Sequence, residues 1–143
     1  MKHLPIALCS LIVCFFSSIL ITSIEAEEVQ YQFFGRHMVA QYYDCNVEAL
    51  NNTKQLAETM KQATIVSGAH LLQAIDYAFE PCGFTMILLL SESHASIHTY
   101  PEHKACFIDF FTCGHNCSAE KFDAVLRNYL QPKRVVSDIK ERK

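Results

Sequence analysis

Residues 84–90 constrain the fold most, because they form an apolar run that is interrupted only by Thr85. A short run of this composition is typical of a strand that is buried on both faces of a sheet. Residues 80–83, Glu-Pro-Cys-Gly, precede it and predict a turn, since Pro fixes φ and Gly tolerates the positive φ that hairpins require. We therefore expect a sheet built around this strand, which ends where a polar segment begins at Ser91.

The chain before this run predicts one strand and one helix. Residues 29–43 are aromatic and β-branched, which is typical of a strand, and residues 44–52 are polar and loop-like. A helix follows, with an N-cap at Asn52 or Thr53 and a C-cap at Gly68. Its apolar residues recur at helical spacing on one face: Leu56, Met60 and Ala63.

Further strands are predicted over residues 69–79, 95–100 and 104–112. A second helix begins after an N-cap at Ser118 and ends before Pro132. Its apolar face is formed by Phe122, Val125, Leu126, Tyr129 and Leu130.

Residues 134–139 add an edge strand, so that we expect an α+β fold in the order β-α-β-β-β-α-β. The sheet is expected to be antiparallel, and both helices must bury their apolar faces against one face of it. This gives a two-layer sandwich. With 143 residues, half of them hydrophobic, the chain is long enough for one domain with a sizeable core.

The first 26 residues are expected to lie outside this domain. A lysine and a histidine precede an apolar run over residues 4–24, and Ala26 stands just before two glutamates. This layout is typical of a secretory signal peptide, with an uncleaved N-terminal anchor as the alternative. We therefore expect residues 1–26 to export the chain or anchor it to a membrane, and residues 27–143 to form the domain. Without a functional leader the chain would be cytoplasmic.

Charge and residue spacing exclude several classes of function. The formal charge of -3, with no basic stripe, argues against nucleic acid as a partner and favours a small-molecule ligand. The cysteines beyond the leader are odd in number and irregularly spaced, so they predict neither a disulfide framework nor a zinc site. The histidines over residues 94–115 also lack a metal-ligand spacing, and no nucleophile-elbow glycines of a hydrolase are present. No metal is therefore expected.

The polar segment at residues 91–102, together with residues 111–114, predicts a catalytic site. These residues bring hydroxyl, imidazole, carboxylate and thiol groups into a region that otherwise has the pattern of apolar strands. Burying such groups costs free energy unless they have partners or a task, and groups of this kind gather at active sites.

Five short motifs resemble, in order, those of the prokaryotic S-adenosylmethionine decarboxylases, and the similarity runs from about Gly35 to about Arg134. Members of that family are proenzymes that cut themselves between a Glu and a Ser, and the Ser becomes a pyruvoyl group at the new N-terminus. The resemblance implies a cut between Glu92 and Ser93. The motifs are Gly35-Arg36-His37, Tyr43-Asp44-Cys45, Ser91-Glu92-Ser93-His94, Ile97-His98-Thr99-Tyr100-Pro101-Glu102 and Phe111-Thr112-Cys113-Gly114.

The resemblance implies a decarboxylase that makes decarboxylated S-adenosylmethionine for spermidine and other polyamines. Loss of CO2 leaves a carbanion, and a ketone that forms a Schiff base with the substrate amine is an electron sink that no side chain offers. Ser93 is expected to become this ketone, after a cut into a β chain of residues 27–92 and an α chain of residues 93–143. By resemblance, His98 removes the Cα proton during processing, and Cys113 returns a proton to the substrate carbon.

The same resemblance assigns the substrate contacts. Phe79 and Tyr100 correspond to aromatic residues that sandwich the adenine, and Glu102 to a carboxylate that holds the ribose hydroxyls. Thr85 stands where relatives usually carry a Ser that assists processing. The family also forms dimers, which implies a homodimer of cleaved αβ units.

Strand geometry adds one expectation about the site. Ser93 and His98 would lie on opposite faces of an extended segment, so the chain is expected to turn near the cut and bring them together, with Cys113 approaching from the neighbouring strand. Two alternatives stay open. One is a pyruvoyl-dependent arginine or ornithine decarboxylase on the same scaffold, and the other is a non-catalytic exported binding protein.

Overall fold

The computed structural model describes residues 31–143, and the predicted leader at residues 1–26 lies outside this part of the chain. In the described residues, no helix is both long and apolar enough to span a bilayer. The elements are β1 (Tyr31–Tyr43), α1 (Val47–Asn51), α2 (Thr53–Ser67), β2 (Leu71–Ala78), β3 (Phe84–Leu90), β4 (Ser93–Tyr100), the 3₁₀ helix η1 (Pro101–His103), β5 (Ala105–Gly114), α3 (Ala119–Leu130) and β6 (Arg134–Arg142).

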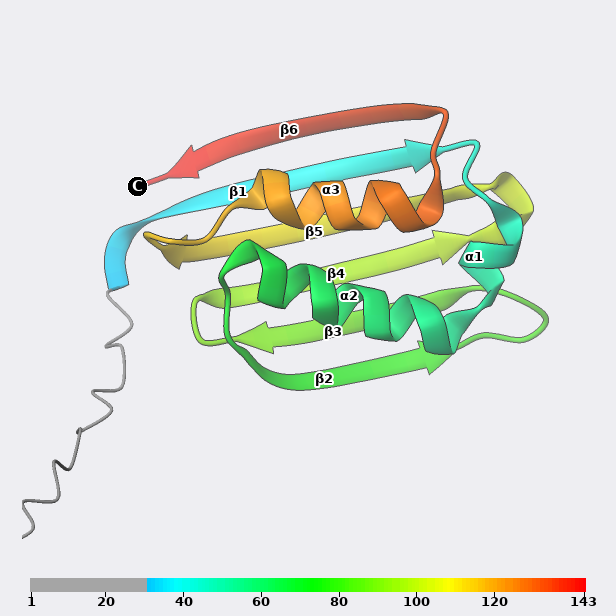
Figure 1. Ribbon diagram of the computed structural model, residues 1–143, viewed down its shortest axis with the longest axis horizontal. Coiled ribbons are helices and arrows are strands. Elements are labelled where there is room, and N and C mark those ends of the chain that lie inside the picture. The colour runs from blue at the N-terminus through cyan, green and yellow to red at the C-terminus, as the bar shows by residue number, and fades with distance from the viewer. Residues whose placement is uncertain (1–30) are drawn as a thin grey trace, which may run out of the picture.

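One antiparallel sheet contains these strands in the order β2-β3-β4-β5-β1-β6. Helices α2 and α3 lie side by side across one face of it (Figure 1). The predicted α+β two-layer fold is therefore confirmed. The predicted element order is wrong in two details. Four strands lie between α2 and α3, which matches the four segments predicted as strands but not the three in the predicted order. The predicted loop at residues 44–52 contains α1, which Asn46 caps.

Both long helices begin and end where the cap residues predict. Asn52 caps α2 by accepting a hydrogen bond from the backbone N–H of Gln55 at 3.2 Å, and Gly68 ends the helix with a φ of 89°. Ser118 caps α3 in the same way, accepting from the backbone N–H of Lys121 at 3.2 Å. These hydrogen bonds satisfy backbone groups that a helix end otherwise leaves unpaired.

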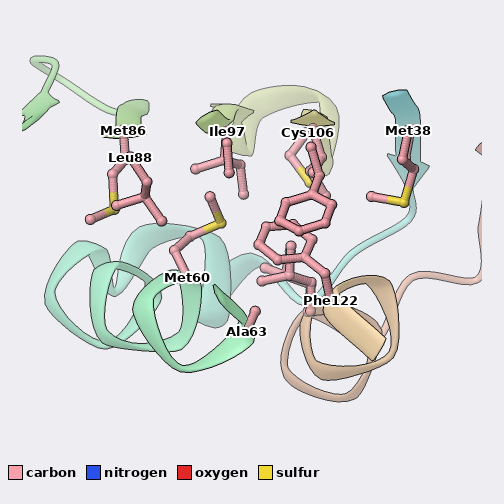
Figure 2. Packing of buried hydrophobic residues seen from close by; sticks show 14 of the residues in the cluster. Met38, Met60, Ala63, Met86, Leu88, Ile97, Cys106 and Phe122 are labelled. Atoms are coloured by element: carbon pink, nitrogen blue, oxygen red, sulfur yellow. The ribbon is translucent and has the colours of Figure 1, made fainter. Parts of the chain in front are cut away.

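The hydrophobic core lies between the sheet and the two long helices. Figure 2 shows Met60 and Ala63 of α2 and Phe122 of α3 pointing toward strand residues such as Met86, and all of these are fully buried. Phe122 also stacks on Phe110 of β5, with ring centroids 4.3 Å apart. This packing fixes α3 against the strand that carries Cys113.

Strand β3 is buried on one face only, so the prediction that both faces are buried is wrong. Its alternate residues face the helices, whereas Ile87 and Leu89 lie on the other side and are 46% and 50% exposed. We call this helix-free side of the sheet, to which Thr85, Ile87 and Leu89 belong, the open face. Neighbouring strands expose further large apolar side chains on it: Val39, Ile75, Tyr77, Phe107 and Val136.

The two ends of the sheet carry different groups. At the hairpin end, β3 turns into β4 through residues 91–92, and β5 finishes at Gly114. At the loop end, residues 79–83 join β2 to β3, and η1 joins β4 to β5. These ends lie on the left and the right of Figure 1, respectively.

Candidate active site

The carbonyl oxygen of Glu92, at the predicted cut, accepts hydrogen bonds from two donors of one residue. Cys113 near the end of β5 is adjacent to the hairpin, because Ser93 pairs with Thr112. Both the backbone N–H and the Sγ of Cys113 donate to the Glu92 oxygen, each at 3.0 Å. Two donors aimed at one carbonyl oxygen stabilise the negative charge that develops there in acyl transfer. The hairpin end can therefore support attack on the Glu92–Ser93 peptide bond.

Ser93 itself has a backbone conformation that residues with a side chain rarely adopt. Its φ is 149°, and holding a non-glycine residue in such a region costs about 1–3 kcal/mol. Its Oγ lies 3.1 Å from Nδ1 of the next residue, His94. A distorted peptide with a hydroxyl beside an imidazole is a suitable starting geometry for an N-to-O acyl shift.

The side chain of Glu92 is buried and anchored to the start of β2. It is 2% exposed, and its carboxylate accepts the backbone N–H of His70 at 2.9 Å and lies 2.6 Å from His70 Nδ1. The backbone N–H of Ser91 also donates to the His70 carbonyl at 2.9 Å. The chain on the N-terminal side of the cut is therefore fixed in place. Sequence analysis missed His70, because it belongs to no motif and lies 22 residues from Glu92.

Gly114 leaves the space that this arrangement requires. A Cβ at this position would lie 2.7 Å from Cγ of Glu92 and 2.8 Å from Sγ of Cys117, which is closer than packed atoms approach. Burial, followed by the nearby charges of Glu92 and Cys113, raises the pKa of the Cys117 thiol to about 11. Cys117 therefore stays protonated at neutral pH.

The loop end holds a second pair of predicted site residues. Thr85 on β3 is directly opposite His98 on β4, and the Oγ1 of Thr85 lies 3.0 Å from the Nδ1 of His98. Both side chains are on the open face. The Thr85 hydroxyl is therefore placed to orient the imidazole ring of His98.

The predicted substrate-binding residues are also at the loop end. Phe79, in the loop after β2, and Tyr100, at the end of β4, are 50% and 38% exposed. Each ring has an aromatic neighbour, since Phe79 contacts Tyr77 at 4.8 Å and Tyr100 contacts Phe107 at 5.3 Å between ring centroids. Glu102 on η1 accepts a hydrogen bond from Sγ of Cys82 at 3.7 Å. The loop end therefore carries exposed aromatic faces, the carboxylate of Glu102 and the imidazole of His98.

The site residues at the hairpin end and those at the loop end do not come together within one chain. Ser93 and His98 belong to the same strand, β4, and five residues of extended chain span roughly 16 Å. The chain turns next to the predicted cut, at residues 91–92, as expected, but the expectation that this turn brings Ser93 to His98 is wrong. The expected approach of Cys113 from the neighbouring strand is observed.

A family model described as S-adenosylmethionine decarboxylase matches residues 36–143. The chain belongs to the S-adenosylmethionine decarboxylase family. The S-adenosylmethionine decarboxylase proenzyme of Thermosipho melanesiensis is 39% identical over 101 residues, which cover 71% of this chain and 78% of that protein. The proenzyme of Parasynechococcus marenigrum is 42% identical over 100 residues, which cover 70% and 78% of the two proteins.

Solved structures agree with this family membership. The crystal structure of the adenosylmethionine decarboxylase from Aquifex aeolicus has a TM-score of 0.71 and 30% identity, and the match covers 76% of this chain and 90% of that one. A Trypanosoma brucei AdoMetDC structure has a TM-score of 0.53 and 15% identity, covering 73% of this chain and 45% of that one, which shows likeness of fold alone. The S-adenosylmethionine decarboxylase family identified from the five motifs is therefore confirmed.

Proposed function

We propose that this chain decarboxylates S-adenosylmethionine with a pyruvoyl group that it makes from its own Ser93. The observation that carries the proposal is the pair of hydrogen bonds from Cys113 to the carbonyl oxygen of Glu92. These donors activate the one peptide bond that the family relationship expects to be cut. The strained φ of Ser93 supports the same reaction, because strain in the uncut state is released when the peptide breaks.

Processing follows from the positions of the chain's own groups. The Ser93 hydroxyl attacks the Glu92 carbonyl carbon, the donors of Cys113 hold the oxygen as it gains charge, and the C–N bond breaks to leave an ester. His98 then removes the Cα proton of Ser93, so that the ester is eliminated as the C-terminal carboxylate of Glu92 and a dehydroalanine remains. The dehydroalanine adds water and releases ammonia to give the keto group. The carboxylate of Glu92 stays bound to His70 throughout and keeps the acyl carbon in place.

The residues near the cut fit the completed pyruvoyl group. When formed, this group supplies an electron sink for the carbanion that remains after CO2 is lost. Cys113 is then free of the peptide carbonyl and gives its proton to the substrate carbon. Phe79 and Tyr100 hold the adenine and attract the sulfonium cation, and Glu102 binds the ribose hydroxyls.

A homodimer completes this site. Since His98 is roughly 16 Å from Ser93 along β4, the imidazole that removes the Cα proton of Ser93 comes from a second copy. The open face carries the large apolar side chains that such pairing would bury. A two-fold axis running across the strands places the hairpin end of one subunit over the loop end of its partner, so that each site combines Ser93 with the partner's His98.

The product, decarboxylated S-adenosylmethionine, serves spermidine and polyamine synthesis in this proposal. The family match does not favour arginine, ornithine or a non-catalytic role. We keep export or membrane anchoring through residues 1–26 as a proposal about location, based on the apolar run and Ala26.

Intact mass of the purified full-length chain tests these proposals together. We expect two fragments separated before Ser93, a keto group on the second, and loss of residues 1–26 from the first. Ser93→Ala should give one uncut chain without CO2 release from S-adenosylmethionine. Ser96→Ala, also on β4, is the matched control and should be cut like the wild type. An uncut wild-type chain would overturn the decarboxylase proposal, and a cut chain that keeps residues 1–26 would overturn cleavage of the leader.

A further inference from the structure

Ser93 has a partner for its hydroxyl proton that the resemblance does not assign. The Ser93 Oγ lies 3.1 Å from Nδ1 of His94, which is within hydrogen-bond distance, whereas His98 is five residues further along β4. We propose that His94 is the base for the first step of processing, taking the proton of the Ser93 hydroxyl as its oxygen attacks the Glu92 carbonyl. This assignment rests on the proposed self-cleavage before Ser93.

His94 is an exposed residue of the open face whose ring packs beside two aromatic neighbours. Its ring packs against Phe111 with centroids 5.8 Å apart, and the ring of His37 on β1 packs against the same Phe111 at 5.4 Å. His37 is fixed in turn, because its Nε2 lies 3.2 Å from Oδ1 of Asp109 on β5. The guanidinium of Arg142 on β6 covers Phe111 at 4.5 Å. Packing against Phe111 restricts the imidazole of His94 while its Nδ1 lies within hydrogen-bond distance of Ser93.

The charges around His94 favour its neutral form, which is the form that accepts a proton. Burial lowers the pKa of His94 below its ordinary value of 6.5, and the positive charges of His37 and Arg142 act in the same direction. Asp109 opposes them by favouring the charged imidazole. From β3, the pairing partner of His94 is the apolar Leu89. At neutral pH, Nδ1 of His94 is therefore free to accept the Ser93 proton.

The step balances without any external reagent. The Oγ–H bond of Ser93 breaks and its proton moves to Nδ1 of His94, while Oγ bonds to the Glu92 carbonyl carbon and closes a five-membered ring. The carbonyl electron pair moves onto the oxygen that Cys113 holds. When the pair returns, the C–N bond breaks, and the Ser93 nitrogen takes the proton from His94. The result is an ester and a free amine, with His94 neutral again.

This order of events separates the roles of two histidines. His94 acts before the ester exists, and His98 acts on the ester by removing the Cα proton. A variant at His94 should therefore stop at the intact peptide, and a variant at His98 should stop at the ester. Hydroxylamine cleaves esters and leaves ordinary peptide bonds intact, so that it distinguishes the two blocked states.

The experiment follows cutting of freshly synthesised full-length chains by denaturing electrophoresis, with and without hydroxylamine. We expect His94→Asn to cut at least about 100-fold more slowly than wild type and to gain no fragments with hydroxylamine. Asn keeps a hydrogen-bonding group near the position of Nδ1 but cannot take a proton. His98→Ala should instead be cut by hydroxylamine. His103→Ala, on η1, is the matched control and should be cut at the wild-type rate.

Two further measurements distinguish loss of the base from a folding defect in the His94 variants. Added imidazole should restore cutting of His94→Ala, which a purely structural role would not predict. In His37→Gln, the lost positive charge should raise the pKa of His94, so that the pH at which cutting falls to half moves upward.

Three results would overturn the assignment: wild-type cutting by His94→Asn, an ester trapped in that variant, or an unchanged pH profile in His37→Gln. A wild-type chain that is never cut would instead overturn the proposed function itself.

Discussion

Cys113 contributes two different groups to one carbonyl, and they can be separated by substitution. The backbone N–H donates to the Glu92 oxygen whatever the side chain is, whereas the Sγ donates only as a thiol. Cys113→Ala should therefore slow cutting by roughly 100-fold, in line with the loss of one donor to a developing oxyanion. The rate of fragment formation measures this.

Two further variants test the prediction for Cys113→Ala. Cys113→Ser keeps a donor and should recover much of the cutting rate, while its hydroxyl should be a poorer proton donor to substrate. Cys82→Ala, a thiol at the loop end, should be cut normally. Equal cutting rates for Cys113→Ala and wild type would show that the thiol does not hold the oxygen.

At the scale of elements, Tyr42 ties β1 to α3. Its ring is fully buried in the core, and its hydroxyl donates to Oδ1 of Asp123 at 2.5 Å. Burial and this contact with Asp123 raise the pKa of Tyr42, so that the hydroxyl remains a donor. Tyr42→Phe should lower the free energy of unfolding by about 1–3 kcal/mol, measured by urea denaturation. Tyr43→Phe removes only an exposed hydroxyl contact and should change it little, and equal losses would contradict this account.

Arg36 on β1 and Glu120 on α3 also join these two elements at the protein surface. The guanidinium of Arg36 donates to Glu120 at 2.7 Å. The carboxylate of Glu120 accepts hydrogen bonds from the backbone N–H of Glu120, from Arg36 and from Ser118. Together they lower the pKa of Glu120 from its ordinary 4.5 to about 2. A lowered carboxyl pKa stabilises the fold above pH 4.5, and this contribution is lost as pH falls toward 2.

We therefore expect the Tm of the wild type to fall further than that of Glu120→Gln between pH 4.5 and 2. Glu58→Gln is the control, because Glu58 pairs with Lys61 within α2 alone. Parallel loss of Tm in the wild type and Glu120→Gln would contradict a role for this pair in acid stability.

Elements with local signals could be predicted from the sequence, and those that depend on distant contacts could not. The caps at Asn52, Gly68 and Ser118 are local, so both long helices were placed correctly. Helix α1 was missed because it has only five residues, too few for an apolar repeat to show. The apolar pattern of β3 predicts burial on both faces, whereas one face is free of helices, because a strand's composition does not show what covers each face of the sheet.

At the scale of the whole molecule, the proposed sharing of the site between two subunits predicts how mixed dimers behave. Ser93→Ala chains lack the reacting serine but keep His98, and His98→Ala chains have the reverse defect. Neither should be cut alone. When both are produced together, the His98→Ala chain should be cut, because its partner supplies the missing imidazole. Electrophoresis of differently tagged chains measures this.

A surface variant provides the control for this complementation. Adding Ile87→Asp to both chains places a charge on the open face and should abolish the rescue, while Ile65→Asp, on the exposed side of α2, should not. Absence of cutting in the mixed sample, with dimers present by sedimentation, would show that the site is not shared.

The motifs predict the site residues, and the structure shows how these residues are arranged within one chain. The spacing between Ser93, His98 and Cys113 fits strands, but spacing alone cannot tell whether two residues meet within a chain or across two. The contacts of His70 and His94 depend on how β2 begins and on the backbone at Ser93. Neither is visible as a sequence pattern.

The order of strands has a consequence for when the chain can be severed. Strand β1 comes from the part before Ser93, yet it lies between β5 and β6, which both come from the part after it. The oxygen donors at the cut are also on β5. In the proposed processing, cutting therefore follows folding, because the donors of Cys113 reach the Glu92 oxygen only after the sheet has formed. The two fragments would then be held in one sheet, and they could separate only if that sheet unfolded.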